Sequence, residues 1–276
     1  IVAESAAGAL SLVSGDGTAV LAVPSKLSQY VIAHRGGSAV AEENSLDAFK
    51  YAFAAGARHI EMDVRVSSNG TVVVMHDATT TRTTNTADTV ASTTTAAIQA
   101  AVLDLMNSTG GNGYNRTANP PLLAQVLEWA ADKPVTLWIE AKVDCAAAIV
   151  TELQNYRIPG NRAVIQAFTQ SWLTPAIEAG YDVVKLHTGS MASVDFPAIA
   201  ALGVEYVGGD TWTSGQVTSC KAAGCTPVAY TVYYLTQAED FNALGIDYLM
   251  WADPEMSRGR LRSKTTFAGG KFPAGI

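Results

Sequence analysis

Eight short runs of β-branched and aromatic residues recur along the chain, and stretches rich in Ala and Leu separate most of them. This alternation predicts strands joined by helices, which is typical of a parallel sheet. Eight such units in 276 residues predict an α/β fold, a TIM (β/α)8 barrel in which residues 1–276 form a single domain. The strands are expected at residues 30–34, 59–64, 136–142, 163–168, 183–188, 205–209, 227–232 and 248–252.

Two segments interrupt this alternation. Residues 1–29 form an N-terminal extension in which two apolar runs flank a Gly-Asp-Gly sequence, and this predicts a hairpin. Residues 78–120 are rich in Thr, Asn and Gly and form an insertion after the second strand. Connections of this length are usually functional, so the insertion is expected to shape the rim of a site. A ninth strand at 71–76 follows a short Ser-Ser-Asn-Gly turn and is expected to fold back on the second strand.

Composition excludes several classes of protein. Hydrophobic residues make up 48% of the chain and charged residues 16%, so the chain can bury a large core. A net charge of −7 and the lack of Lys or Arg runs argue against a nucleic-acid partner. No apolar run reaches the roughly 18–20 residues of a membrane span, so no transmembrane segment is expected. Transient contact with a lipid surface is compatible with this composition.

The chain begins at Ile1 and is rich in Ala, Thr and Ser, which predicts a secreted or extracytoplasmic bacterial protein whose leader or tag has been removed. Two interpretations fit the cysteines. Cys220 and Cys225 are close enough in sequence for a short-loop disulfide that leaves Cys145 unpaired. Three buried free thiols fit equally well.

Strand alternation predicts that three acidic side chains meet. Glu61 and Asp63 share one face of the second strand, and the apolar residues around them share the other, so the carboxylates are expected to point into the barrel. The same rule points Glu140 inward from the third strand. Barrel enzymes carry their sites at these C-terminal strand ends. Three converging carboxylates repel one another without a cation, and oxygen ligands suit Ca²⁺ or Mg²⁺, so one divalent ion is expected.

Two histidines are expected at the same end of the barrel. His34 ends the first strand and precedes Arg35 and two glycines, which let the backbone approach an anion closely. His76 ends the return strand of the hairpin. Cleavage of a phosphodiester requires a base, an acid and groups that neutralise the phosphoryl oxygens, and this set supplies them. His59 lies deeper in the barrel and is assigned to the core. His187 on the fifth strand is left open between a structural role and substrate contact.

Four motifs follow one another along the chain: HRGG with EENSLDAF, then IEMDVRVSSNGTVVVMHDATTTRTT, IEAK and GIDYLMWADPE. Their order and spacing resemble the glycerophosphodiester phosphodiesterase family, which is related to phospholipases D of the sphingomyelinase D type. The resemblance runs from about His34 to Arg260. It implies a TIM barrel with a small insertion after the second strand.

The resemblance also implies roles for the polar residues of the site. Glu61, Asp63 and Glu140 would bind Ca²⁺ or Mg²⁺. His34 and His76 would be the catalytic acid and base, in an order that the sequence leaves open.

Further residues are predicted to contact the substrate. The resemblance implies that Arg35 holds the phosphate, and Glu43 and Lys142 match the family's acidic and Lys positions. Trp212 follows the sixth strand and is expected to form an aromatic wall for an apolar or choline-bearing group. Trp251 is expected near the pocket as well, with burial in the core as the alternative. Departures from the family pattern near the pocket wall, such as Glu42 in place of Pro, bear on the substrate and not on the reaction.

The sequence thus predicts a metal-dependent hydrolase for a glycerophosphodiester or lysophospholipid. Its products would be an alcohol and a phosphomonoester such as glycerol 3-phosphate. Attack by water and attack by a neighbouring substrate hydroxyl, which gives a cyclic phosphate, both remain open. The alternative is a phospholipase D or lysophospholipase D that acts on lipids. A non-enzymatic binding module on a degenerate barrel is expected to lack a catalytic group, and none is missing here.

Overall fold

The structure is a computed structural model that describes residues 31–38, 41–103 and 118–252, together with three short N-terminal strands. The strands β1 (Val2–Glu4), β2 (Leu10–Val13) and β3 (Ala19–Leu21) form an antiparallel sheet of their own. The pairing of β2 with β3 confirms the hairpin expected around Gly-Asp-Gly. Residues 104–117 of the insertion lie outside the described residues.

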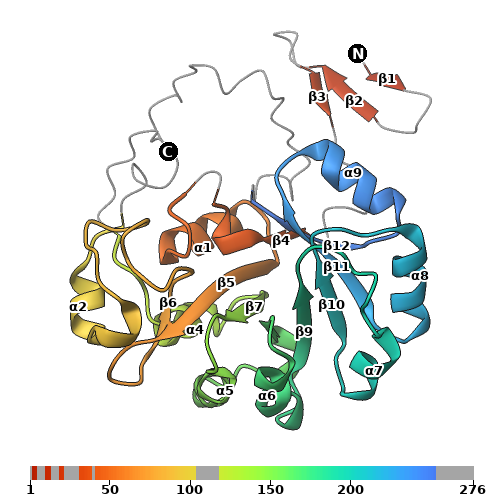
Figure 1. Ribbon diagram of the computed structural model, residues 1–276. Coiled ribbons are helices and arrows are strands. Elements are labelled where there is room, and N and C mark those ends of the chain that lie inside the picture. The colour runs from red at the N-terminus through yellow and green to blue at the C-terminus, as the bar shows by residue number, and fades with distance from the viewer. Residues whose placement is uncertain are drawn as a thin grey trace.

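A closed barrel of eight parallel strands dominates the described part of the chain (Figure 1). The ring closes because β4 pairs in parallel with both β5 and β12. This confirms the predicted TIM barrel, with strand boundaries within two residues of those expected. The strands are β4 (Val31–Ala33), β5 (His59–Val66), β7 (Thr136–Ala141), β8 (Ala163–Ala167), β9 (Asp182–His187), β10 (Tyr206–Gly209), β11 (Thr226–Val232) and β12 (Tyr248–Trp251).

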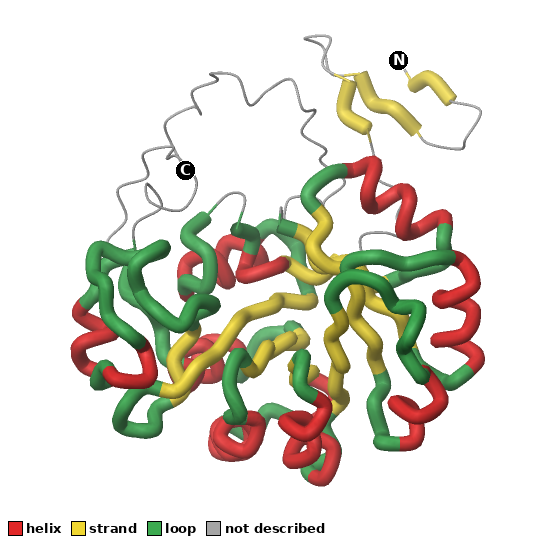
Figure 2. Tube along the Cα trace, in the orientation of Figure 1, coloured by secondary structure: helices red, strands yellow, loops and turns green. Residues whose placement is uncertain are grey.

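Helices cover the outside of the barrel strands (Figure 2). The α-helices are α1 (Leu46–Ala54), α2 (Thr95–Ala100), α4 (Leu123–Ala130), α5 (Ala146–Asn155), α6 (Thr174–Glu178), α7 (Phe196–Ala201), α8 (Ser214–Ala222) and α9 (Leu235–Ala243). Short 3-10 turns are η1 (His34–Gly36), η2 (Val90–Ser92), η3 (Gly160–Arg162) and η4 (Gln170–Leu173). Within the described ranges, no helix has the length and apolar character needed to cross a membrane.

Strand alternation divides the apolar core into two layers. Ile32, Trp138 and Met250 belong to a cluster inside the barrel. Ile60 and Ile139 belong to a larger cluster that the outer strand faces share with the helices. Burial of one large apolar side chain stabilises the fold by about 1.5–3 kcal/mol. Both layers are buried only when the strands keep this register, so both layers favour it. A one-residue slip would exchange the layers and move the carboxylates out of the barrel.

The hairpin expected after β5 is present. Strand β6 (Val72–Val74) pairs antiparallel with the end of β5, with Val64 opposite Val74. The ladder continues beyond it, because the Met75 N–H donates to the Asp63 carbonyl at 2.9 Å. This bond places the next residue, His76, beside the C-terminal end of β5.

The described cysteines are free thiols in the core. Cys145, Cys220 and Cys225 are all buried and unpaired. The Cys220 thiol contacts the Cys225 carbonyl at 3.7 Å, and the Cys225 thiol contacts the Val204 carbonyl at 3.4 Å. Of the two interpretations of the sequence, the structure therefore has three buried thiols.

Strand β4 ends one residue earlier than expected, because the chain turns sharply after it. Arg35, Gly36 and Gly37 all have positive φ, and His34 belongs to the turn η1. A Cβ on Gly36 would lie 2.7 Å from Phe49 Cδ1 and 2.9 Å from the Ala48 side chain. Only glycine satisfies both the backbone angle and this close approach to α1.

We expect Gly36→Ala to lower the free energy of unfolding by about 1–3 kcal/mol, the usual cost of one strained backbone position. Chemical denaturation of the purified variant measures this loss. Gly215→Ala is the matched control, because a Cβ there has nothing within 4 Å. An unchanged midpoint for Gly36→Ala would show that the close approach to α1 is relaxed in solution.

Candidate active site

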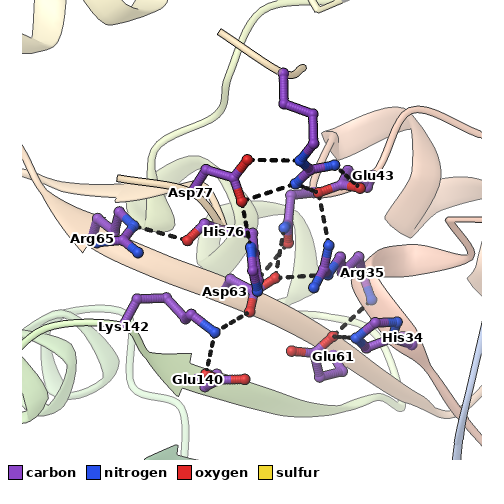
Figure 3. Close-up of polar contacts among 12 residues, drawn as sticks. His34, Arg35, Glu43, Glu61, Asp63, Arg65, His76, Asp77, Glu140 and Lys142 are labelled. Carbon is purple, nitrogen blue, oxygen red and sulfur yellow. Dashed lines mark hydrogen bonds and ion pairs between the residues drawn. The ribbon is translucent and has the colours of Figure 1, made fainter. Parts of the chain in front are cut away.

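Charged and titratable side chains converge at the C-terminal ends of β4, β5 and β7 and the end of the β5–β6 hairpin, and Figure 3 labels ten of them. They include all of the polar residues that the sequence predicts for the site. The ten are His34, Arg35, Glu43, Glu61, Asp63, Arg65, His76, Asp77, Glu140 and Lys142.

Three carboxylates form the floor of this site. Glu61 and Asp63 are each 1% exposed, and Glu140 is 13% exposed by its side chain. Asp63 and Glu140 are direct partners in the pairing of β5 with β7. One carboxylate oxygen from each of the three residues lies within 4.8 Å of the others. The inward orientation predicted from alternation is therefore correct for all three.

Burial and mutual repulsion oppose ionisation of this cluster. Burial, then the charges of Asp63 and Glu140, raises the pKa of Glu61 well above its usual value. Burial and the Asp63 charge raise the pKa of Glu140 to about 7. Burial alone would raise the pKa of Asp63 too, but Arg35 and other cations nearby lower it. Further positive charge is needed for all three groups to be ionised together.

The donor atoms of the cluster fit a hard divalent ion. Asp63 Oδ1 is buried and has no hydrogen-bond donor in the described structure. The Lys142 ammonium is 3.7 Å from this oxygen and 2.5 Å from Glu140 Oε1. Ca²⁺ and Mg²⁺ take oxygen ligands and leave positions open to water or substrate. Glu61, Asp63 and Glu140 are therefore the residues that would hold such an ion.

Arg35 carries a cation to the edge of the carboxylate cluster. Its own N–H donates to Glu61 Oε2 at 2.7 Å, a bond that the left-handed backbone at Arg35 makes possible. Its guanidinium lies 3.1 Å from Asp63 Oδ2 and donates to Glu43 Oε1 at 3.0 Å. A guanidinium fixed in this way can bind phosphoryl oxygens.

The two predicted histidines reach the site from different elements. His34 Nε2 lies 4.0 Å from Glu61 Oε2, and His34 Nδ1 is buried with no hydrogen-bond partner among the residues that the structure describes. Burial, and then Arg35, lowers the pKa of His34 to about 3. Burial also lowers the pKa of His76, although Asp63 opposes this shift. Both imidazoles are thus neutral at neutral pH and able to accept a proton.

His76 is held at two points. Its Nδ1 lies 2.6 Å from Asp77 Oδ1, which leaves Nε2 for the site. The Arg65 guanidinium donates to the His76 carbonyl at 2.8 Å. A carboxylate on one nitrogen of a histidine fixes the ring's orientation and favours the tautomer with its proton on that nitrogen.

Five residues of the site were not predicted from the sequence, and Arg65, which binds the His76 carbonyl, is one of them. The Asn44 amide donates to Asp63 Oδ2 at 2.8 Å and accepts from the Asp63 N–H at 3.0 Å. Gln166 on β8 is 3.4 Å from Glu61 Oε1, and the alternation rule used for Glu61 would have found it. Asp77 and Arg82 complete the set. Both occur in the motif after His76, where no periodic pattern points them toward the site.

The prediction of Trp212 as an aromatic wall is wrong, and for Trp251 the structure has the alternative, burial in the core. Trp212 is 8% exposed, stacks on Phe196 and donates its indole N–H to the Val228 carbonyl. Trp251 is 2% exposed and belongs to the same cluster between strands and helices. Met250 faces the barrel interior, so alternation along β12 turns Trp251 outward.

His59 is a core residue, as predicted. It accepts a hydrogen bond from the Trp138 indole at 3.1 Å, and its ring contacts Tyr248 edge to face.

Comparison with known proteins agrees with this site. The family model of the glycerophosphoryl diester phosphodiesterase family matches residues 34–256, and the chain belongs to this family. A glycerophosphodiester phosphodiesterase of Caldanaerobacter subterraneus is 53% identical over 55 residues, which cover 20% of this chain and 23% of the relative. The curated relatives align over less than half of their own length.

Solved structures share the fold. A phosphodiesterase from Oleispira antarctica, in complex with the product sn-glycerol-3-phosphate, superimposes with a TM-score of 0.73 at 23% identity, over 83% of this chain and 94% of that one. A glycerophosphodiester phosphodiesterase from Parabacteroides distasonis superimposes with a TM-score of 0.68 at 22% identity, over 83% and 94% of the two chains.

We expect Glu61→Gln to weaken binding of Ca²⁺ or Mg²⁺ by at least the roughly 10–100-fold that loss of an outer-sphere partner costs. The amide keeps the shape of the side chain but removes one anionic ligand. Titration calorimetry measures the affinity, and Glu205→Gln is the control because Glu205 is exposed at the other end of the barrel, before β10. Equal affinities for the two variants would place the ion elsewhere.

Proposed function

We propose that this protein hydrolyses a glycerophosphodiester to an alcohol and a phosphomonoester such as glycerol 3-phosphate. One observation carries the proposal: two imidazoles, His34 and His76, lie on separate elements beside the same buried carboxylates. Membership of the family supports the reaction class. The product bound to the Oleispira relative supports the choice of glycerol 3-phosphate as the released half.

The residues of the site divide the reaction between them. One histidine, in its neutral form, accepts the proton of the nucleophile. The other takes up a proton before it donates one to the leaving oxygen, and the negative charge of the bound phosphodiester favours this protonation. The Arg35 guanidinium binds a non-bridging phosphoryl oxygen, where negative charge increases as the nucleophile adds. Lys142, 2.5 Å from Glu140, provides a second cation at the same edge. A divalent ion on Glu61, Asp63 and Glu140 would polarise the phosphoryl group further.

Lipid substrates are a second candidate, and one observation favours them. Phe168, just after β8, is 40% exposed and lies beside the Lys142 ammonium, 5.8 Å from ring centroid to Nζ. Tyr233, just after β11, is also exposed. Exposed rings at this end of the barrel suit an apolar or choline-bearing leaving group. Assays of choline release from glycerophosphocholine, lysophosphatidylcholine and sphingomyelin separate the two candidates.

We expect His34→Ala and His76→Ala each to lower kcat by roughly 10²–10⁴-fold, the usual contribution of a general acid or base. The measurement is release of glycerol 3-phosphate from glycerophosphodiesters. His187→Ala is the matched control and should keep most of the activity, because neighbouring Leu186 faces the barrel interior and turns His187 away from it. Near-normal turnover in either of the first two variants would contradict the acid/base pair.

We also expect excess chelator to abolish hydrolysis and added Ca²⁺ or Mg²⁺ to restore it. The reason is that Glu61 and Glu140, whose pKa values burial raises, need a cation in order to be ionised together with Asp63. Initial rates measured across chelator and metal concentrations provide the test. Full activity in excess chelator would remove the ion from the proposal.

A further inference from the structure

Arg82 makes two forked ion pairs at once. Its Nε and Nη2 donate to Asp77 Oδ2 and Oδ1 at 2.6 and 3.1 Å. Its Nη1 and Nη2 donate to Glu43 Oε2 and Oε1 at 2.8 and 2.7 Å. One planar guanidinium therefore joins two carboxylates from separate segments of the chain, one before α1 and one after β6.

Each of these carboxylates holds a residue of the proposed mechanism. Asp77 bonds to His76 Nδ1, and Glu43 accepts from Arg35. The bonds from Arg82 are the largest cause of the lowered pKa of Asp77, so this carboxylate stays ionised. Burial would raise the pKa of Glu43, but the bonds from Arg82 and the charge of Arg35 lower it.

The Thr-rich run on either side of Arg82 is tightly hydrogen-bonded, so the backbone that carries the arginine is held in place. Thr80 is fully buried, and its hydroxyl accepts from the Asp88 N–H at 2.9 Å and bonds to the Thr86 hydroxyl at 2.7 Å. The Thr84 hydroxyl donates to the Thr80 carbonyl at 2.9 Å. Hydrogen bonds of the threonine hydroxyls thus hold this irregular segment in one conformation.

We propose that Arg82 is a positioning residue, which acts through Asp77 to fix the tautomer and orientation of His76 with the bonded proton on Nδ1 and the lone pair of Nε2 toward the site. The catalytic part of this inference depends on the proposed function; the part that concerns the tautomer does not. Glu43 is the second anchor of the fork and prevents rotation of the guanidinium about its bonds to Asp77.

The fork requires arginine specifically. A lysine ammonium is a point charge that cannot occupy both oxygens of two carboxylates in one plane. Loss of the fork should affect kcat more than KM. Arg35 keeps its contacts with Asp63 and Glu61 when Arg82 is removed, so phosphate binding changes less than proton transfer.

Two variants test the inference, Arg82→Gln and Arg82→Lys. In the wild type, ¹⁵N NMR of the four histidines should show His76 as the single Nδ1–H tautomer, with His76→Asn used for assignment. Both variants should give a tautomer mixture at His76 and a kcat lowered by about 10–100-fold, the usual effect of removing an outer-sphere partner. Arg82→Gln combined with Asp77→Asn should be no slower than Asp77→Asn alone, because the two residues act in series.

Arg162→Gln controls for the loss of a well-bonded arginine. Arg162, just before β8, donates to four backbone carbonyls from the end of α4 to the start of β7, at the end of the barrel opposite the site. This variant should lose thermal stability but keep the His76 tautomer and kcat. An unchanged His76 spectrum in Arg82→Gln, or full recovery of tautomer and kcat in Arg82→Lys, would overturn the inference. Absence of hydrolysis in the wild type would instead overturn the proposed function, and the NMR result would stand.

Discussion

Repulsion between three buried carboxylates is the interaction on which the rest of the site depends. Glu61, Asp63 and Glu140 point into one end of the barrel, where little water screens their charges. The protein surrounds them with donors: the backbone and side chain of Arg35, the amide of Asn44, and the Lys142 ammonium. These contacts offset part of the repulsion and leave one oxygen of Asp63 without a donor from the described part of the chain, which concentrates the remaining negative potential at one place.

Charge around the cluster is arranged in alternating layers. Outside the carboxylates lie Arg35 and Lys142, then the second pair of carboxylates, Glu43 and Asp77, and then Arg82. Each layer has the sign opposite to its neighbours, so the cations that would face a phosphate are themselves fixed by anions. Preorganised charges of this kind need no reorientation when the charge of a substrate changes.

Sequence alone predicts most of the fold and the inner part of the site. Alternation along β5 and β7 places Glu61, Asp63 and Glu140 correctly, because a buried barrel strand has only two faces. The same alternation along β12 could have placed Trp251 outside the barrel interior, since Met250 beside it faces inward. Trp212 lies in a loop, where no period applies. Asn44 and Arg82 lie outside the strands and helices and act through contacts with distant segments. No periodic pattern in the sequence reveals such contacts.

The β5–β6 hairpin sets the spacing of Asp63 and His76 independently of the length of the segment that follows. Asp63 lies on β5, and His76 follows β6 directly after Met75, whose N–H donates to the Asp63 carbonyl and closes the antiparallel ladder. Their spacing is therefore set by sheet geometry, upstream of the Thr-rich segment. Beyond the Thr-rich run that holds Arg82, the rim can therefore diverge in length and composition among descendants of one ancestral barrel, so new leaving groups can be accommodated while the carboxylates and histidines keep their places.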